Sequence, residues 1–512
     1  MRKLWRLIFS RYAISAFIIV GEIALIWYLI LGATAIFTYV VMALAVAVNI
    51  ITIVSIINRD ANPEYKVTWL VVVLCVPLLG AFLYAIFYQR RISKREEKLL
   101  RGIFGEMNNH HLGRSNFDML RRRSPLASGK ARAIMHDDPI AEVYVNSRST
   151  FFASGEKYFE SLIFELKNAK KFIFLEYFII ASGELWDEIH AILVEKARAG
   201  VEVRVLYDDI GCMSTLPSRY EQTLRLEGIQ AYRFSPISPK MSSVHNNRDH
   251  RKLCIIDGRV GYTGGVNIAD EYVNKKERFG HWKDGGIQLR GEALRGLIKE
   301  FFTGWDLTAR TVSDYGYYLD CVESVENGDG GYYLPFSSGP APIYQRPVGK
   351  NAFLNLINQA RNYVYITTPY LVIDYDMTEA LCNAALRGVD VRIITPGIPD
   401  KKKVWIMTQS AYPYLMKSGV KIYEYTPGFI HEKCFVADDK YAVIGTINFD
   451  YRSLVHNYEN AVWMYVSPTC LSVRDEFMQT LKHCRQIDEN KCKLSIRDWI
   501  IRNGIRLFAP LL

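Results

Sequence analysis

The sequence predicts an α/β protein in which N-terminal transmembrane helices precede two similar α/β lobes related by a pseudo-twofold axis. Three observations predict this fold class. The first 90 residues contain long apolar runs without charge. From about residue 141, strand and helix patterns alternate, as they do in domains built on a parallel or mixed sheet. A short polar motif in the middle of the chain returns once near its end.

The charge of the chain is concentrated at its N-terminal end. Residues 1–140 contain 18 Lys and Arg against 9 Asp and Glu, so +9 of the net +10 lies there and the rest is nearly neutral. Basic charge beside apolar runs indicates contact with anionic membrane lipid. A nucleic-acid-binding protein more often carries its basic charge on the folded domain, so we expect no nucleic-acid partner.

Nine cysteines are scattered along the 512 residues, with no C-x-x-C pair and no zinc-ligand spacing. We therefore expect no metal site, no cofactor and a reducing compartment for the globular part. Cys254 and Cys434 follow motif lysines on predicted core strands. We interpret them as small buried residues and not as nucleophiles.

Residues 1–90 are predicted to be a membrane anchor with two or three transmembrane helices. Segments 33–57 and 67–88 are uncharged, and the second contains Pro77. Both exceed the roughly 20 apolar residues that a span needs, and a proline within such a helix is tolerated. Segment 12–31, apolar apart from one glutamate, also qualifies. A cleaved signal peptide is its rival interpretation, although no small-residue cleavage site is obvious.

The charge distribution conflicts with a topology of three spans, because both ends of the anchor are basic. Residues 1–11 and 89–101 are both rich in Lys and Arg, yet three spans would place them on opposite faces. Because 89–101 directly follows a clean span, the positive-inside rule predicts a multi-pass cell-membrane protein with a cytoplasmic catalytic domain. Segment 12–31 would then be interfacial or re-entrant. Residues 91–140 show no periodicity and are expected to form a basic juxtamembrane linker.

The first lobe is expected over residues 141–310. Its helices are predicted at 155–169, 184–199, 217–227 and 291–309, and its main strands at 171–180 and 201–209. Asp208 and Asp209 end a strand, where α/β sites gather, although they could equally cap a helix or a turn. A Pro- and Ser-rich loop, 235–249, then leads to the first motif.

The second lobe, 341–512, follows a connector at 311–340 and repeats the first. Helices are predicted at 349–361, 376–387 and 403–417, and strands at 363–369, 388–397 and 419–425. Gly200 to Gly388 is an offset of 188 and Gly228 to Gly419 one of 191, whereas the motifs are 181 apart. The surplus of about ten residues falls in loop 235–249, where insertion is easiest.

The repeated motif is H-x-K-x4-D followed by Gly and Asn. The first copy is His250, Lys252, Asp257, Gly264 and Asn267, and the second is His431, Lys433, Asp438, Gly445 and Asn448. All five positions are offset by 181 residues. Two ordinary strands that end in solvated charges would explain one copy, but not two copies in register.

Two imidazoles and two ammonium groups suit an anionic phosphodiester. A neutral His can attack phosphorus and form a phosphohistidine, while a protonated His can donate to the departing alkoxide. Two Lys can hold the phosphate oxygens without a metal. Because neither motif alone supplies a nucleophile and an acid, we expect the site between the lobes. All six H, K and D residues are candidate catalytic residues, but Asp257 and Asp438 end their strands and suit a structural or supporting role.

This pattern resembles the duplicated motif of the phospholipase D superfamily. From about residue 34 to the C-terminus the chain is similar to bacterial cardiolipin synthases of that type. The similarity rests on F-G-x-W-K-D at 279–284, S-S-G-P at 337–340, G-F-I-H-E-K at 428–433 and G-T-I-N-F-D-Y-R-S at 445–453. The C-terminal sequence, R-L-F-A-P-L-L, resembles the R-L-x-x-P-L-L tail of the family. The last helix, within 497–512, is either interfacial or an ordinary packing helix.

The resemblance implies two phospholipase-D-type lobes and a cardiolipin synthase. A phosphatidyl group would pass from one phosphatidylglycerol to another through a phosphohistidine, giving cardiolipin and glycerol. His250 would be the nucleophile and His431 the acid. Asp284 would orient a catalytic His, and Glu459, its counterpart, would buffer the second His, with Asn267 and Asn448 in support. A structural ion pair with Arg452 is the other interpretation of Glu459.

Three alternatives stay open at this point. Water could accept the phosphatidyl group, which would make a phospholipase D, or another alcohol such as ethanolamine or serine could do so. A nuclease on the same scaffold is a different class of function. The near-neutral globular part and the apolar N-terminus argue against it. The expected partners are thus phosphatidylglycerol and anionic membrane lipid, with the oligomeric state left open.

Overall fold

The computed structural model describes residues 35–88, 94–236, 247–341, 343–488 and the single positions 504, 506 and 507. The chain forms two compact units. One comprises Met1–Arg91, Ile237–Asn247 and Asn503–Leu512, and the other Ile92–Pro236 and Arg248–Arg502. The apolar segment 12–31 lies outside the described residues, as does nearly all of the closing helix expected within 497–512.

Among the described residues of the first unit are the apolar helices α3 (Ala35–Ile57), α4 (Pro63–Cys75) and α5 (Pro77–Tyr88). Within α3, residues Thr38–Ile57 are long and apolar enough to cross a membrane. In the part of the chain that the structure describes, this is the one helix that meets that length and composition. The helix predicted from segment 33–57 is therefore present.

The prediction of a single helix over residues 67–88 is wrong, because the helix is interrupted at Pro77. Pro77 has no N–H to continue the helix, and its ring forces the preceding residue out of the helical region. Val76 accordingly has φ −136° and ψ 82°. The rings of Trp69 and Tyr84 lie 5.4 Å apart, centroid to centroid, across the break. Helices α4 and α5 thus fold back on one another as a short hairpin.

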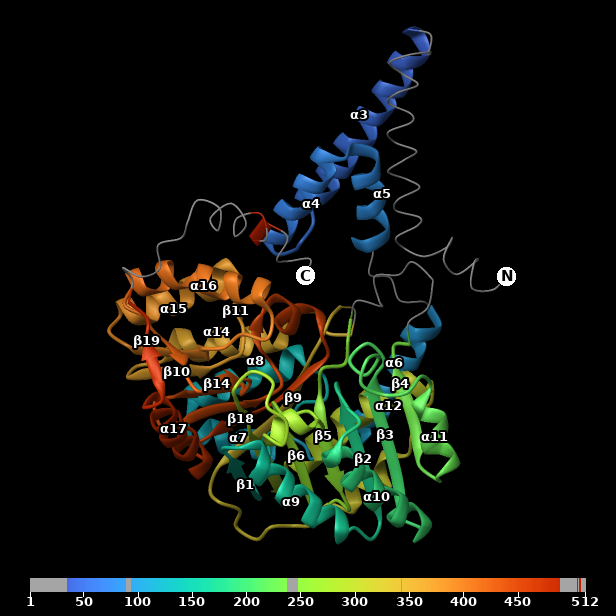
Figure 1. The fold of residues 1–512 in the computed structure, drawn as a ribbon, viewed down its shortest axis with the longest axis vertical. Helices are drawn as coiled ribbons and strands as arrows, with labels where there is room; N and C mark the ends of the chain where they lie inside the picture. Colours follow the sequence, from blue (N-terminus) through green and yellow to red (C-terminus); the bar gives the residue numbers. More distant parts are fainter. Residues whose placement is uncertain are drawn as a thin grey trace. The chain divides into compact units, whose positions relative to one another are not determined.

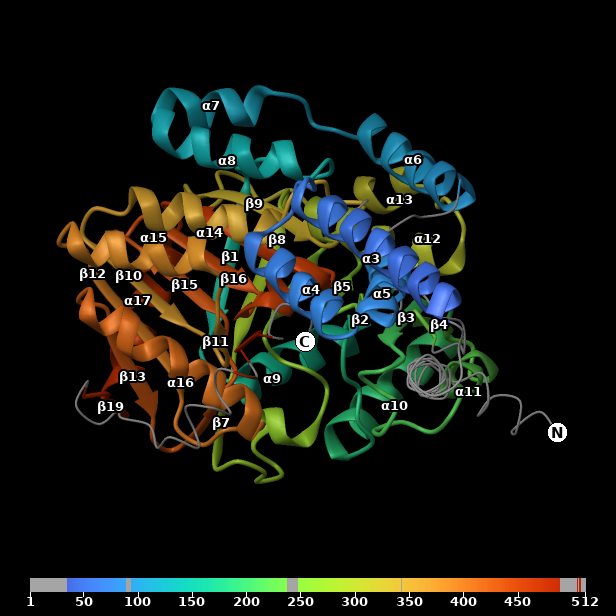
Figure 2. The ribbon, with the colours of Figure 1, turned by 90° about the horizontal axis from the view of Figure 1, so that it is seen from above.

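Residues 94–137, expected to be an aperiodic linker, form three helices of the second unit. These are α6 (Lys94–Asn109), α7 (Ser115–Arg123) and α8 (Pro125–Asp137). The side chain of Ser124 caps α8 by accepting from the N–H of Ala127 at 3.1 Å, with proline at the first helical position. Ala127, Ala131 and Ile134 form its buried face, which packs against the second lobe (Figure 2). The Ser-Pro pair at the start of α8 and the helical spacing of its three apolar residues, four and then three positions apart, are the sequence signals that indicate this helix.

The first lobe is a seven-stranded mixed sheet with the order β1-β8-β6-β5-β2-β3-β4. Strands β2, β3 and β4 are parallel and the rest antiparallel. The strands are β1 (Ser147–Phe152), β2 (Phe172–Tyr177), β3 (Glu202–Asp208), β4 (Gln230–Phe234), β5 (Lys252–Ile256), β6 (Val260–Gly264) and β8 (Gly286–Gly291). The helices are α9 (Gly155–Lys167), α10 (Glu184–Arg198), α11 (Tyr220–Leu226) and α12 (Leu294–Ala309), with η2 (Asp270–Val273) between β6 and β8.

The second lobe repeats this order as β9-β18-β16-β15-β10-β12-β13, with β19 added at the edge. The strands are β9 (Tyr332–Ser338), β10 (Tyr363–Thr367), β12 (Asp390–Pro396), β13 (Lys421–Tyr425), β15 (Cys434–Ala437), β16 (Tyr441–Gly445), β18 (Glu459–Tyr465) and β19 (Cys484–Gln486). The helices are α14 (Val348–Gln359), α15 (Tyr375–Leu386), α16 (Lys402–Lys417) and α17 (Pro468–Leu481), with η3 (Arg452–His456) before β18. Helix α13 (Tyr315–Asp320), in the connector, packs on the first lobe. The prediction of two similar sheet-containing α/β lobes is therefore confirmed.

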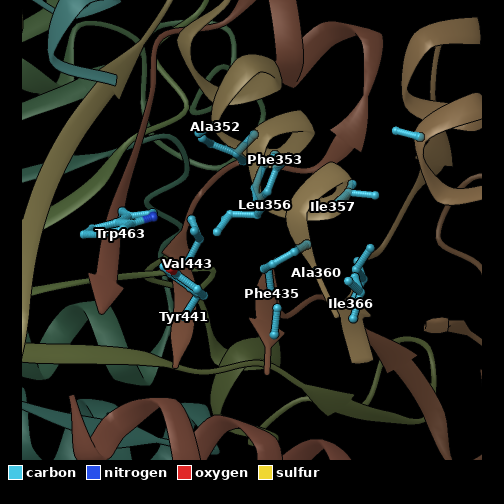
Figure 3. Packing of buried hydrophobic residues seen from close by; sticks show 14 of the residues in the cluster. Ala352, Phe353, Leu356, Ile357, Ala360, Ile366, Phe435, Tyr441, Val443 and Trp463 are labelled. Carbon is cyan, nitrogen blue, oxygen red and sulfur yellow. The ribbon is translucent and has the colours of Figure 1, made fainter. Parts of the chain in front are cut away.

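The lobes lie side by side within the second unit (Figures 1 and 2). Buried side chains form clusters between and outside their sheets. One cluster lies between the sheets and includes Phe174, Phe301 and Val462. On the outer face of the second sheet, Phe353 of α14 packs toward Phe435 of β15 (Figure 3). Each such side chain contributes about 1.5–3 kcal/mol on burial.

Short main-chain pairings join the two lobes next to the motifs. β7 (His281–Lys283) pairs in parallel with β14 (Gly428–Ile430), and an isolated bridge joins Asp249 to Tyr458. A further two-stranded sheet, β11 (Leu371–Val372) with β17 (Phe449–Asp450), lies within the second lobe. The cross-lobe pairings fix the two motif segments relative to one another.

Candidate active site

Both motifs lie at the edge of their sheet where the parallel strands end. Lys252 begins β5 and pairs with Tyr177, the last residue of β2. In the second lobe, Lys433 directly precedes Cys434, which pairs with Thr367 at the end of β10. The carboxyl ends of parallel strands are where sites of α/β proteins form.

His250 is held by the main chain and by a side chain of the second lobe. Its backbone N–H donates to the carbonyl oxygen of Tyr458 at 2.8 Å. Its ring Nδ1 lies 2.8 Å from Oε2 of the adjacent residue, Glu459. The imidazole is thus fixed in position and orientation by two consecutive residues of the other lobe.

His431 has the mirrored arrangement. Its backbone N–H donates to the carbonyl oxygen of Lys283 at 2.7 Å, and its Nδ1 lies 2.6 Å from Oδ2 of Asp284. Each motif His is therefore paired with a carboxylate of the opposite lobe. This crossed pairing brings Asp284 to His431 and Glu459 to His250, whereas the resemblance led us to expect Glu459 beside the second His.

Burial favours the neutral form of both imidazoles in the free protein. Burial, followed by the charge of Lys433, lowers the pKa of His431 to about 3. Burial and then the charges of Lys252 and Lys433 hold the pKa of His250 well below its ordinary value. A neutral imidazole that donates its Nδ1–H to a carboxylate carries its lone pair on Nε2. Both rings consequently present Nε2 for chemistry.

The two carboxylates differ in their surroundings. Burial alone would raise the pKa of Asp284, but His431 and the Lys433 ammonium outweigh it and the pKa is lowered. Burial raises the pKa of Glu459 to about 8. Glu459 also accepts hydrogen bonds from the Thr446 hydroxyl at 2.5 Å and the Asn457 amide at 3.3 Å. The two His–carboxylate pairs are thus chemically unequal.

Two buried lysines complete the site. Nζ of Lys252 donates to the carbonyl oxygen of His250 at 2.6 Å, and Nζ of Lys433 lies 3.0 Å from Nε2 of His431. Burial lowers the pKa of Lys252 to about 7 and that of Lys433 to about 8. Among the described residues, no group of three or more His, Cys, Asp or Glu is arranged to hold a metal. Buried ammonium groups of this kind bind an anion strongly, because water does not compensate their charge.

The motif aspartates lie at the opposite ends of their strands from the lysines. The carboxylate of Asp257 accepts from three consecutive backbone N–H groups, residues 170–172, at 2.7 to 2.9 Å. Asp438 does the same with residues 361–363, at 2.8 to 3.1 Å. These bonds tie the starts of β2 and β10 to the turns after β5 and β15. The geometry gives the two aspartates a structural contact, away from the histidines with which the motif groups them.

We predict that Asp438→Ala lowers stability and spares chemistry. Loss of hydrogen bonds from backbone N–H groups to a carboxylate should reduce the free energy of unfolding by about 1.5–3 kcal/mol. Thermal unfolding of the detergent-solubilised protein measures this, together with kcat per folded molecule, which should stay within about threefold. Asp439→Ala is the matched control, because Asp439 shares the left-handed backbone but bonds only to the side chains of Tyr363 and Arg474 among the described side chains. An unchanged melting temperature with lost kcat would contradict the structural role.

The two motif asparagines have different environments. Oδ1 of Asn267 accepts from the N–H of Ile179 at 3.0 Å, and its Nδ2 donates to the hydroxyl of Tyr272 at 2.6 Å. The Tyr272 ring packs edge-on against His431, 5.4 Å away. Asn448 is buried, and its side-chain oxygen has no partner among the described residues. Asn267 thus supports one wall of the site.

Aromatic side chains that line the histidines were missed in the sequence. The ring of Phe178 lies 4.9 Å from His250, and the rings of Trp282 and Phe429 lie 5.7 and 5.8 Å from His431. Trp282 lies within the W-K-D segment and Phe429 two residues before His431. Their proximity to the motif was the available signal.

Asp208, for which the sequence left two interpretations, positions the first motif. Its carboxylate forms a two-pronged ion pair with Arg248, with Nε and Nη2 each 2.9 Å from a carboxylate oxygen, and accepts from the N–H of Asp249 at 3.0 Å. It also accepts from the next turn, at Ile210 and Gly211. Asp208 therefore fixes the chain just before His250. Asp209 pairs with Arg233 instead.

Thr446 has a role that its counterpart Gly265 cannot share. A Cβ on Gly265 would lie 2.2 Å from Oδ1 of Asp284, so no side chain fits beside the shorter carboxylate. Opposite the longer Glu459, the Thr446 hydroxyl reaches Oε2 and lowers the pKa of that carboxyl.

We predict that Thr446→Val lowers kcat about tenfold, the cost of one hydrogen bond to a charged group. Without the hydroxyl the pKa of Glu459 rises further, so the limb of the pH–rate profile that reports its ionisation should move to higher pH. Thr446→Ser should restore both rate and profile. A slower Thr446→Val with an unmoved profile would mean that the hydroxyl only fills space.

Both lobes match the same protein-family model. The family model described as cardiolipin synthase, PLD-like domain, matches residues 162–278 and 353–481, one stretch in each lobe. A second model, described as phospholipase D-nuclease N-terminal, matches residues 47–87, within the first unit.

Individual relatives agree with this. The chain is 41% identical over 465 residues to an uncharacterized protein of Streptococcus mutans, covering 90% of this chain and 99% of that one. It is 34% identical over 467 residues to the cardiolipin synthase of Geobacillus kaustophilus, covering 90% and 91%. The phosphatidylserine synthase structure from Haemophilus influenzae superposes with a TM-score of 0.57 at 15% identity, over 75% of this chain and 98% of that one, and shares the fold. The chain belongs to the bacterial cardiolipin synthase family of the phospholipase D superfamily.

Proposed function

We propose that this protein is a phosphatidyltransferase that makes cardiolipin and glycerol from two molecules of phosphatidylglycerol. The observation that carries the proposal is the crossed pairing of His250 with Glu459 and of His431 with Asp284, beside two buried lysines. This arrangement supplies one imidazole as the nucleophile, one as the general acid, and two cations for a single phosphodiester. Membership of the cardiolipin synthase family supports the choice of reaction.

In the first step, Nε2 of His250 attacks the phosphorus of a phosphatidylglycerol and a P–N bond forms. The P–O bond to the headgroup glycerol breaks. His431, which takes up a proton from solution when the anionic substrate binds, gives that proton to the glycerol oxygen. The assignment follows the family resemblance. Among the described residues Nε2 of His250 has no hydrogen-bond partner, whereas the Lys433 ammonium lies 3.0 Å from Nε2 of His431 and occupies the lone pair that a nucleophile would need. Nε2 of His250 thus keeps its lone pair available.

In the second step, the free hydroxyl of another phosphatidylglycerol headgroup gives its proton to His431 and attacks the same phosphorus. The P–N bond breaks, His250 returns to its neutral form and cardiolipin leaves. Lys252 and Lys433 hold the non-bridging oxygens throughout. Asp284 and Glu459 orient the imidazoles and stabilise their charged forms. Asp257, Asp438 and Asn267 act through the structure of the site.

A product assay tests the proposal. The full-length protein is placed in membranes whose only phospholipid is phosphatidylglycerol, and lipids are measured by mass spectrometry. Cardiolipin with an equal amount of free glycerol is expected. Phosphatidic acid alone would mean that water is the acceptor and the enzyme is a hydrolase. Product formed only after ethanolamine or serine is added would identify a different alcohol acceptor.

We also propose a division of the chain into an anchor at 1–90 and a catalytic body with lobes at 141–310 and 341–512, joined by the connector 311–340. Segment 91–140 is assigned to the body, because the buried face of α8 packs in the core of the second lobe. The last part of the connector, β9, serves as the edge strand of the second sheet.

For the anchor we propose two spans and a re-entrant hairpin, with the catalytic body in the cytoplasm. α4 and α5 have 13 and 12 residues, so each is about 18–20 Å long at 1.5 Å per residue, too short for a 30 Å hydrocarbon core. If the hairpin enters and leaves on one face, segment 12–31 and α3 become the two spans. The basic residues 1–11 and 89–101 then share the cytoplasmic face, as the positive-inside rule requires.

The position of Asp60, between α3 and α4, distinguishes this arrangement from three spans. In a background in which all nine native cysteines are replaced, a cysteine at Asp60→Cys should react with a membrane-impermeant thiol reagent only after the cells are opened. Labelling of intact cells would place that turn outside and restore three spans. Because the readout is chemical labelling, it does not depend on enzyme activity.

A further inference from the structure

We propose that two loops at the edge of the sheets form a docking rim for an anionic bilayer surface. The rim consists of residues 209–219, after β3, and residues 397–403, which follow β12 and enter α16. It goes beyond the proposed reaction, because it concerns how the folded lobes meet the lipid layer. It depends on the proposed function only in taking a bilayer lipid as the substrate.

Both loops leave their sheets at the edge that carries the motifs. Tyr207, next to the end of β3, is level with Tyr177, which pairs with Lys252. In the second lobe, Ile394 of β12 is level with Thr367, whose partner adjoins Lys433. The rim therefore begins within a few residues of both halves of the active site.

The first loop packs closely against the side of the active site that contains Phe178. A Cβ on Gly211 would lie 2.0 Å from the carbonyl oxygen of Phe178, so the two backbones are in close contact. The Cys212 sulfur lies 3.2 Å from the N–H of Ile180. Since the Phe178 ring contacts His250, the loop is fixed directly beside the first histidine.

The second loop is held in an equivalent place. The hydroxyl of Tyr370 donates to Asp400 at 2.6 Å, and the Lys401 ammonium lies 5.6 Å from the Tyr370 ring centroid. Tyr370 packs on Phe429, which in turn packs on His431. The charge of Lys401 also acts on His250. This loop therefore borders the same site from the other lobe.

The rim exposes apolar side chains in positions that the duplication repeats. Ile210 and Ile398 are offset by 188 residues, as Gly200 and Gly388 are, and are 41% and 40% exposed. Met213, in the first loop, is 65% exposed. A single exposed apolar residue needs no explanation. The same residue exposed at both copies of one loop, each time beside the active site, indicates a shared contact.

The rim also carries positive charge. Lys401, Lys402 and Lys403 are exposed at the start of α16, whose first turn has no acidic residue. Exposed apolar side chains next to lysines are typical of surfaces that lie in the headgroup layer of an anionic membrane. The core of a protein–protein interface is depleted in lysine. The composition therefore favours a bilayer over a protein partner, and docking there would set the site opening against the lipids.

The test uses the full-length protein in vesicles of phosphatidylglycerol and phosphatidylcholine. A fluorescent label is placed on single cysteines in a background in which all nine native cysteines are replaced. Labels at Met213→Cys and Ile398→Cys report the rim. Leu226→Cys and Leu386→Cys are matched controls, because these residues are more exposed, at 90% and 70%, but end helices that precede β4 and β12 at the opposite sheet edge. Quenchers attached to lipid chains should reduce the rim fluorescence at least threefold more than that of the controls.

Three outcomes would overturn the rim. Equal quenching at all four positions would mean that it has no preferred contact with lipid. Stronger quenching at the controls would place the bilayer at the other edge. Rim labels that are shielded from a water-soluble quencher but not reached by the lipid quencher would mean that a protein covers the loops.

Kinetics provide an independent readout. The variant Ile210→Ser/Met213→Ser/Ile398→Ser should lose about tenfold in rate on vesicles and stay within twofold of wild type on short-chain lipid dissolved as monomers. Equal loss on both substrates would contradict docking. If wild type makes no product from phosphatidylglycerol, the proposed reaction fails, while the fluorescence result still decides the rim.

Discussion

His431→Ala should lower the rate of cardiolipin formation by about 10⁴-fold, the upper range for removal of a general acid. The nucleophile in this variant is intact, since His250 and its partner Glu459 are untouched. A phosphatidyl ester with p-nitrophenol as the leaving group needs no proton and should therefore restore release of the alcohol. His250→Ala, which removes the attacking nitrogen, should be equally inactive on both substrates. Release of p-nitrophenol and mass spectrometry of the covalent phosphatidyl-enzyme check both statements.

His281→Ala is the matched control for these variants. His281 is an exposed residue of β7 next to the site, and its Nδ1 lies 3.0 Å from the Tyr425 hydroxyl. Its loss should leave the rate within about threefold. Rescue of His250→Ala instead of His431→Ala would exchange the two roles. A covalent intermediate that survives both substitutions would rule out the two-histidine mechanism.

The second large effect is expected at Lys252, where Lys252→Met should lower kcat by about 10²–10³-fold through loss of charge stabilisation. Because burial lowers the pKa of Lys252 to about 7, the free enzyme loses this cation as the pH rises through that value. We therefore expect kcat/KM to fall above about pH 7. Bound anionic substrate favours the ammonium form, so kcat should fall only at higher pH. Lys252→Arg stays charged at all these values and should remove the decline.

Steady-state rates over a range of pH measure this effect. Lys440→Met, a substitution at an exposed lysine, controls for general loss of charge and should leave the profile unchanged. If the decline persists in Lys252→Arg, the titrating group is elsewhere. Lys433, with its pKa of about 8, would be the next to substitute.

Much of the fold could be predicted from the sequence, because matching residues of the two halves are separated by nearly constant offsets. The offsets of Gly200, Gly228 and their counterparts located the strands, and hydrophobic periodicity located the helices between them. The paired motif brought both histidines and both lysines to one place. The crossed carboxylates Asp284 and Glu459 came from the family resemblance alone, because spacing cannot show which lobe faces which ring.

Other features depended on geometry that the sequence pattern does not contain. Hydropathy over residues 67–88 counts apolar residues and does not show that Pro77 reverses the chain. The motif aspartates looked catalytic by association, although the length of β5 carries Asp257 away from Lys252. The change from Gly265 to Thr446 was visible, but its meaning required the different lengths of the two carboxylates.

The crossed pairing has a consequence for the time course of synthesis. When the ribosome has made only the first lobe, His250 is present without Glu459, and Asp284 has no imidazole to hold. The half-made protein therefore lacks both a placed nucleophile and an acid, whatever membrane it meets. Only when Tyr458 has been made and has paired with Asp249, and Glu459 has followed it, are both histidines fixed. The nascent chain thus stays inert toward the lipids around it until its last strands are in place.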